Sequence, residues 1–72
     1  MIAYFPTAKY TDDDLLKLPS SNHRLVLQAL TEHPGLTSRE LSKRLRLDQY
    51  VVIRCFRWLE STGYIVGTYI SS

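Results

Sequence analysis

Polar side chains follow a helical spacing through residues 49–61. When Val52 is placed at the centre of an inner face, the ~100° per residue of an α-helix brings Cys55, Phe56 and Leu59 to the same side. The side chains that then point the opposite way are Tyr50, Arg54, Arg57 and Ser61. A guanidinium gives two hydrogen bonds to a guanine edge. This outer face therefore offers recognition by hydrogen bonding.

The chain has few residues suited to catalysis. His23 and His33 are ten residues apart, with no cysteine or carboxylate at a metal-ligand spacing. The acids at 12–14 are helix neighbours and point in different directions, and the start of a helix explains them. Cys55 falls in the apolar helical pattern, which favours a small core residue over a nucleophile. We expect no enzyme activity, no metal and no cofactor.

Basic residues are concentrated in the middle of the sequence. Residues 37–58 contain six basic side chains and two acidic ones, whereas residues 1–18 contain two basic and three acidic ones. The net charge of the whole chain is only +2, so its distribution carries the information. A basic segment that includes a helix is typical of a surface that binds nucleic acid.

The length of 72 residues allows one folded unit. We assign residues 1–19 to an N-terminal arm and a short helix, and residues 20–72 to the main domain. A single cysteine argues against a disulfide scaffold, and no segment approaches the ~20 apolar residues of a membrane span. We expect a cytoplasmic protein, associated with the nucleoid, that does not bind membranes.

Helix start and stop signals divide the chain. Residues 1–10 include Pro6 and predict an arm or a short edge strand. Thr11 followed by three aspartates predicts a helix that Pro19 ends within two turns. Ser20, Ser21 or Asn22 can cap the next helix, which ends at His33-Pro34-Gly35. Its expected inner face is Leu25, Val26, Ala29 and Leu30.

The second half of the chain predicts two helices joined by a tight turn. Thr37 and Glu40 have capping-box spacing, so a helix begins at about Ser38, with Leu41 and Leu45 facing inward. Asp48 is placed to cap the helix that follows, and Gly63 to end it. Two helices joined in this way form a helix-turn-helix. After Gly63, residues 64–66 are β-prone, and a turn at Gly67-Thr68 would return Tyr69-Ile70 as the second strand of a small hairpin.

The segment 27–65, LQALTEHPGLTSRELSKRLRLDQYVVIRCFRWLESTGYI, resembles the winged helix-turn-helix core of MarR-like bacterial transcription regulators. The matching elements are Pro34-Gly35-Leu36-Thr37, Glu40-Leu41, Leu47-Asp48, Val52, Arg54, and Leu59-Glu60 leading to Gly63-Tyr64-Ile65. Small co-regulators of the PapI type are a looser parallel. The resemblance implies a mainly α fold with three core helices, a short N-terminal arm and helix, and a small β-hairpin as a truncated wing.

Some residues depart from that pattern. Val51 and Ile53 flank Val52, where such regulators usually have small hydroxyl residues. The short wing puts a minor-groove contact in question. The chain also has no room for the long terminal helices through which such regulators dimerise.

Double-stranded DNA is the partner that this arrangement favours, because the major groove admits one helix and a helix-turn-helix presents its second helix there. The residues expected to read bases are Gln49, Tyr50, Ile53, Arg54 and Arg57. Those expected to contact phosphates are Thr37, Ser38, Arg39, Lys43, Arg44 and Arg46. The function predicted is sequence-specific binding by a small transcriptional regulator, of a chromosome or of a mobile element such as a phage.

Apolar residues on the helix expected over residues 49–61 leave open an alternative, in which this helix contacts protein. Val51 and Trp58 share one flank of this helix. If both are exposed, they would form an apolar patch suited to a protein contact. The N-terminal arm, with Ile2, Tyr4 and Phe5, could cover that flank, or a second copy or another protein could bind there. Contact residues on this hypothesis are Val51, Trp58, Tyr4 and Phe5. The alternative function is a winged-helix module whose third core helix docks on a polymerase, a replication factor or a repressor.

Overall fold

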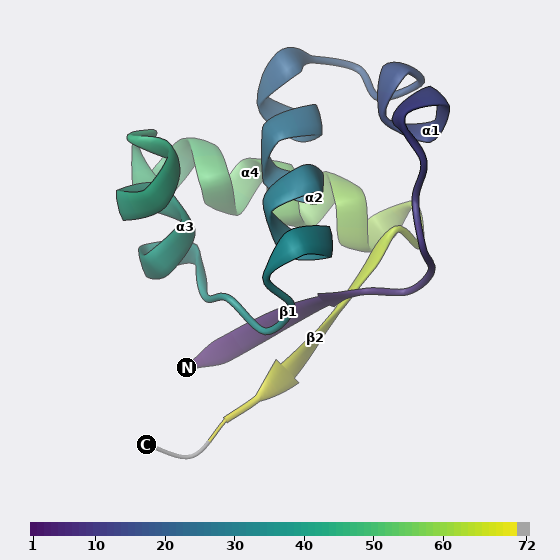
Figure 1. Ribbon diagram of the computed structural model, residues 1–72. Helices are drawn as coiled ribbons and strands as arrows, with labels where there is room; N and C mark the ends of the chain where they lie inside the picture. The colour runs from purple at the N-terminus through teal and green to yellow at the C-terminus, as the bar shows by residue number, and fades with distance from the viewer. Residues whose placement is uncertain (71–72) are drawn as a thin grey trace.

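The computed structural model describes residues 1–70, which form four helices and two strands (Figure 1). In chain order these are β1 (Ile2–Pro6), α1 (Asp12–Leu16), α2 (Ser21–Glu32), α3 (Ser38–Leu45), α4 (Gln49–Ser61) and β2 (Ile65–Tyr69). The expected class, a mainly helical domain with a small antiparallel pair of strands, is confirmed. The longest helix, α4, has 13 residues. Within the described part of the chain, no helix is long and apolar enough to cross a bilayer.

Local capping explains where the helices begin. Thr11 and Asp14 form a capping box at α1, and Thr37 and Glu40 form another at α3. The Ser20 hydroxyl accepts a hydrogen bond from the His23 N–H at the start of α2. Each cap satisfies backbone donors that have no partner inside the helix. The predicted starts of these helices are therefore confirmed.

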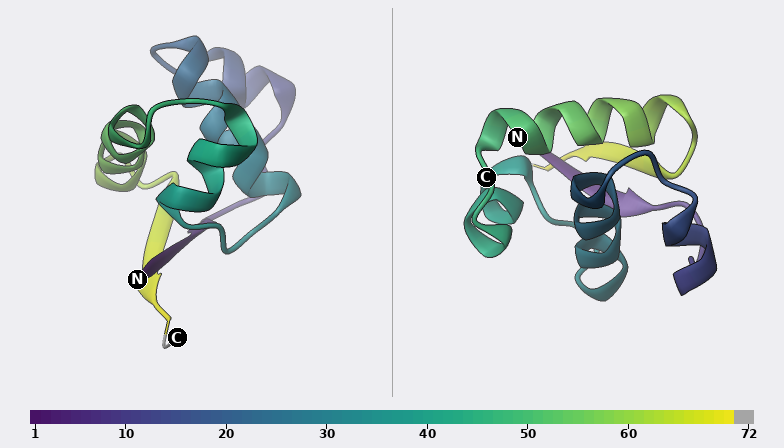
Figure 2. Two further views of the ribbon diagram at one scale, coloured as in Figure 1. Left: turned by 90° about the vertical axis from the view of Figure 1, so that its left-hand side faces the viewer. Right: turned by 90° about the horizontal axis from the view of Figure 1, so that it is seen from above.

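The core lies where α2, α3 and α4 meet. The side chains that are less than 2% exposed include Val26, Leu27, Leu30, Leu41, Val52, Phe56 and Leu59. Seen from above, α4 runs along one side of the molecule and α2 and α3 extend from it (Figure 2). The predicted inner face of α4 is confirmed, since Val52, Cys55, Phe56 and Leu59 are all buried.

The predicted inner face of α2 is wrong at one position. Leu25 is 43% exposed, whereas Leu27 is fully buried. The physical reason is that α2 contacts α4, β1, α1 and α3, so its buried arc extends around the helix to Leu27 and leaves Leu25 outside. Leu45 is half-buried and packs against the core.

The sheet also corrects the predicted wing. β2 runs without interruption through Gly67 and Thr68, where a turn was expected, and it pairs in antiparallel fashion with β1. The register places Ile2 opposite Tyr69 and Phe5 opposite Val66. On its other edge β1 meets the α2–α3 connection, where the Tyr4 N–H donates to the Leu36 carbonyl at 3.0 Å. The N-terminal strand thus lies where the returning strand of a hairpin was expected.

Candidate functional site

The turn between α3 and α4 sets the relative orientation of these helices. α3 ends at Arg46, whose φ of 55° and ψ of 41° are left-handed. The Ser42 hydroxyl donates to the Leu47 carbonyl at 2.6 Å, and the Leu47 N–H donates to the Ser42 carbonyl at 3.1 Å. Asp48 Oδ1 then accepts the Tyr50 N–H at 2.8 Å. These bonds fix a rigid turn, as the predicted helix-turn-helix requires.

The outer face of α4 presents the side chains expected to read bases. Tyr50 is 68% exposed, and Arg54 and Arg57 are also exposed. The Arg54 guanidinium lies 6.0 Å from the centre of the Tyr50 ring, a cation–π distance. Ile53 is half-buried on the same helix. α4 therefore offers hydrogen-bond donors beside an aromatic and an aliphatic surface.

Gln49 connects the starts of the two helices. Its Nε2 donates to Ser38 Oγ at 3.2 Å. Ser38 is the first residue of α3 and Gln49 the first of α4. The hydrogen bond brings one expected base reader and one expected phosphate ligand together.

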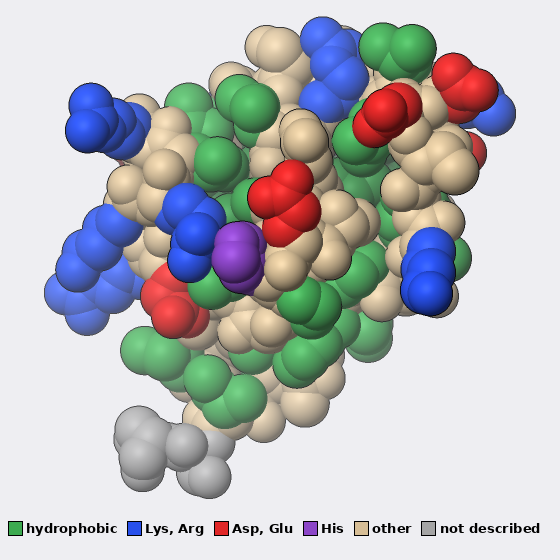
Figure 3. Space-filling view, viewed as in Figure 1, with side chains coloured by type: hydrophobic (Ala, Val, Ile, Leu, Met, Phe, Trp, Pro, Cys, Tyr) green, Lys and Arg blue, Asp and Glu red, His purple; other side chains and the backbone are tan. Residues whose placement is uncertain are grey.

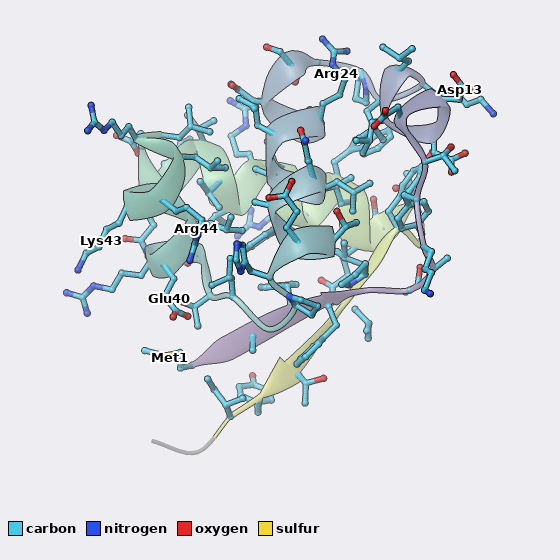
Figure 4. The ribbon with its side chains drawn as sticks, in the orientation of Figure 1. Met1, Asp13, Arg24, Glu40, Lys43 and Arg44 are labelled. Atoms are coloured by element: carbon cyan, nitrogen blue, oxygen red, sulfur yellow. The ribbon has the colours of Figure 1, made fainter. Side chains whose placement is uncertain are left out.

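The basic residues of α3 divide between two faces. Arg39, Lys43 and Arg44, with Arg46 just after α3, are all exposed, and Lys43 points away from the helical bundle (Figure 4). Arg44 points toward α2 and lines a hollow with Glu32 and His33. Arg44 therefore faces a different neighbour from Lys43. That division depends on how α3 is rotated in the fold.

Thr37 is placed differently from the other expected phosphate ligands. It is only 3% exposed, and its hydroxyl accepts the Glu40 N–H at 3.2 Å. Its own N–H donates to the Glu40 carboxylate at 3.0 Å. The side chain of Thr37 thus serves the capping box, and Ser38 is the more accessible hydroxyl at this helix start.

A hollow of about 600 Å³ adjoins these residues and includes the N-terminal strand. It is lined by Met1, Ile2, Tyr4, Thr37, Ser38, Arg39, Gln49, Ile53, Phe56 and Arg57. β1 therefore borders the same surface as α3 and α4. No local pattern indicates that Ile2 lies near Arg39, because β1 reaches this place by pairing with β2, which is distant in the sequence.

Tyr4 joins this strand to α4. Its ring lies 4.0 Å from that of Phe56. Burial, together with the negative charge of Glu60, raises the pKa of the Tyr4 hydroxyl. Glu60 Oε2 also accepts the Gly67 N–H at 3.3 Å. The C-terminal half of α4 is thus attached to both strands.

On the flank of α4 that carries Val51 and Trp58, the contacts to Trp58 come from His23 of α2 and from Tyr64, which precedes β2. The Trp58 ring stacks on that of Tyr64 with the ring centroids 6.0 Å apart, and it forms a T-shaped contact with the His23 ring at a centroid distance of 5.2 Å. Burial lowers the pKa of His23. The hypothesis that the N-terminal arm covers this flank is wrong, because Tyr4 packs on Phe56. Val51 is half-buried at the edge of a hollow of about 380 Å³.

Phe5 lies away from that flank. Its ring approaches Gly35, where an added Cβ would be 3.2 Å from the Phe5 ring. Its exposed fraction is close to two fifths, and it pairs with Val66 across the sheet. The four expected contact residues therefore do not form one patch: Val51 and Trp58 share one side of α4, and Tyr4 and Phe5 belong to the sheet.

The remaining reactive groups are the cysteine and the candidate metal ligands. Cys55 is buried, and burial raises the pKa of its thiol, which disfavours the reactive thiolate. Within residues 1–70, histidine, cysteine and acidic side chains form no group of three that could hold a metal ion.

Comparison with protein families gives one finding. The model described as winged helix-turn-helix DNA-binding matches residues 20–66, which is more than half of the chain. Searches of curated proteins and of solved structures gave no significant match. The matched range contains α2, α3, α4 and the start of β2.

Proposed function

Since the chain belongs to the winged helix-turn-helix DNA-binding family, we propose that it is a small, MarR-like transcriptional regulator that binds double-stranded DNA in a sequence-specific manner. On this proposal α4 enters the major groove and α3 lies across the backbone. The protein would act on DNA in the cytoplasm, on a chromosome or on a mobile element such as a phage.

The observation that carries the proposal is the exposure of Tyr50, Arg54 and Arg57 on the side of α4 opposite the core. A helix that served only to pack would not need two exposed guanidinium groups and a tyrosine in its first three turns. We assign base contacts to this face, with Gln49 and Ile53 at its border. Arg54 can give two hydrogen bonds to guanine, and Ile53 can contact a thymine methyl group.

Phosphate contacts are assigned to the basic residues beside α4. Arg39, Lys43 and Arg46 are exposed, and Ser38 lies at the start of α3. Contacts of this kind supply affinity that depends on salt and not on sequence. Arg44 and Thr37 are expected to contribute less to phosphate binding. Arg44 points toward α2, and Thr37 is buried.

The first experiment measures binding to random duplex DNA by fluorescence anisotropy at two salt concentrations. We expect affinity to fall steeply as salt rises, because cationic side chains release counterions from the phosphates. An operator would then be selected from a random pool. An absence of binding at low salt would contradict the proposal and would favour a module that docks on another protein through α4.

Two substitutions separate base reading from phosphate binding. Arg54→Ala should weaken binding to the operator by about 1–3 kcal/mol and relax the choice at one base pair. Lys43→Ala should weaken binding to all sequences alike and lower the slope of the salt dependence by about one. Lys17→Ala, at the end of α1, is the matched control and should change neither quantity. If Arg54→Ala bound every sequence like the parent, the assignment of α4 would be wrong.

A further inference from the structure

The outer face of α2 has no partner within the described chain. Leu25 is 43% exposed there, and Leu16 of α1, beside it, is 71% exposed. Hollows of about 360 Å³ and 240 Å³ lie on either side of α2, and Leu25 and Gln28 line both of them. Figure 3 shows this face, where hydrophobic side chains lie between basic and acidic ones. Apolar side chains exposed in this way indicate a contact surface.

The exposed residues of α2 form a continuous stripe. Ser21, Leu25, Gln28 and Glu32 are all exposed, at intervals of four, three and four residues. Such spacing places side chains along one side of a helix, as in a seam between two helices. The stripe is therefore shaped to receive another helix along most of the length of α2.

The charges on α2 select the direction of that second helix. Arg24 lies near the start of α2 (Figure 4), and Glu32 is its last residue. Each is four residues from Gln28. When two copies of α2 cross in antiparallel fashion at Gln28, Arg24 of each copy faces Glu32 of the other. A parallel arrangement would instead place like charges opposite each other, which is unfavourable.

From this charge complementarity we propose that α2 binds α2 of a second copy of this chain in antiparallel orientation, with the two-fold axis at Gln28. An interface of this kind uses the same patch on both copies and closes on itself. Leu25 of each copy then fills the hollow beside α2 of the other, near Ala29 and Leu45. The antiparallel helix dipoles add a favourable term. The inference does not rest on DNA binding.

The test is sedimentation equilibrium of the full chain without DNA, from about 1 μM to about 1 mM, the range in which a weak interface dissociates. The parent should form a dimer within this range. Arg24→Glu and Glu32→Arg should each raise the dissociation constant about tenfold or more, because each creates two like-charged contacts. Circular dichroism checks that both variants keep the parent fold.

Mixing the two variants gives the sharpest result. Arg24→Glu makes positions 24 and 32 of α2 both acidic, and Glu32→Arg makes both of them basic. The two chains should therefore associate with each other more tightly than either associates with itself. This rescue would show that positions 24 and 32 lie at the interface, and the weakening in each single variant would distinguish the antiparallel register, because a parallel parent already places like charges opposite each other. A failure of the mixture to associate would overturn the proposal.

Leu25→Gln tests the apolar part of the contact. It should weaken the dimer, whereas Val66→Gln, which alters an equally exposed side chain on β2, should leave it unchanged. The proposal would be overturned if the parent stayed monomeric at the highest concentration. It would also be overturned if substitutions at Arg24, Glu32 and Leu25 left the dissociation constant of the dimer unchanged. Because no DNA is present, either result leaves the DNA-binding proposal to its own test.

Discussion

At the scale of single residues, Gly67 shows how closely the strands approach α4. A Cβ at this position would lie 3.0 Å from Ile2 Cγ2, 3.0 Å from Tyr4 Cε1 and 3.2 Å from Glu60 Oε2. Most Cβ atoms in proteins lie farther than this from their neighbours, so any larger residue here would push the Ile2, Tyr4 and Glu60 side chains aside. The same approach lets the Gly67 N–H reach the Glu60 carboxylate.

Gly67→Ala should therefore destabilise the protein by about 1–3 kcal/mol, the usual cost of inserting a methyl group into a filled space. Urea denaturation followed by circular dichroism measures the change. Thr68→Ala, at the next and exposed position of β2, is the control and should alter stability by less than about 0.5 kcal/mol. Equal stability of Gly67→Ala and the parent would mean that Tyr4 and Ile2 move apart freely.

His23 gives the folded state a dependence on pH. Its Nδ1 lies 2.6 Å from Ser20 Oγ, and its ring forms a T-shaped contact with that of Trp58. His23 and Arg54 both line the hollow of about 380 Å³ beside Val51. Burial lowers the pKa of His23 below its ordinary value of 6.5. The unfolded chain thus takes up a proton at a higher pH than the folded chain does. Stability is full above pH 6.5 and falls as the pH decreases from there toward the folded pKa.

The prediction is that His23→Gln removes this part of the pH dependence. Melting temperatures measured at a series of pH values on both sides of 6.5 should fall toward acid in the parent and fall less in the variant. Asn22→Gln alters another side chain that lines the same hollow but does not titrate, and it should keep the pH dependence of the parent. Parallel curves for His23→Gln and the parent would show that His23 is equally free to protonate in both states.

At the scale of elements, the turn between α3 and α4 combines strain with charge. Arg46 adopts a left-handed conformation, which costs a residue with a Cβ about 1 kcal/mol and costs glycine almost nothing. It is also one of the exposed cations beside α4. A residue that is unfavourable for the turn is thus placed where its charge is useful for binding a phosphate.

Arg46→Gly should raise the free energy of unfolding by up to about 1 kcal/mol while it weakens DNA binding. The slope of the salt dependence should fall by about one, as for the loss of a phosphate contact. Arg46→Ala is the matched control, since it removes the charge but keeps the Cβ: it should lose the same affinity without the gain in stability. A glycine variant with unchanged salt dependence would exclude Arg46 from the DNA contact.

The elements also show what sequence reasoning can and cannot predict. Thr11, Thr37 and Asp48 act on backbone groups two or three residues away, so their helix starts were predictable from local patterns. The outward face of α4 followed from helical geometry alone. The pairing of β1 with β2 was not predictable, because it joins residues such as Ile2 and Tyr69 that no local signal connects. The direction of Arg44 likewise depends on how α3 packs against α2.

At the scale of the whole molecule, residues outside the family match complete the core. Ala3, Leu15 and Leu18 are buried, and Tyr4 packs on Phe56. β1 lies between β2 and Leu36, so it joins the end of the chain to the connection between α2 and α3. We infer that residues 1–19 and 20–70 unfold together as one cooperative unit.

Deleting residues 1–6 tests this inference. The truncated chain loses the partner strand of β2 and uncovers Phe56, a combined loss of about 3 kcal/mol or more by analogy with the removal of a large core side chain. Because a domain of this size is only marginally stable, most of the truncated chains should be unfolded, with no sharp thermal transition and poor dispersion of amide resonances. Phe5→Thr, which alters a partly exposed side chain of the same strand, should keep a cooperative transition near that of the parent. If the truncated chain melted at the parent temperature, the helices alone would be the folding unit, and β1 would serve only the surface that it shares with Arg39 and Gln49.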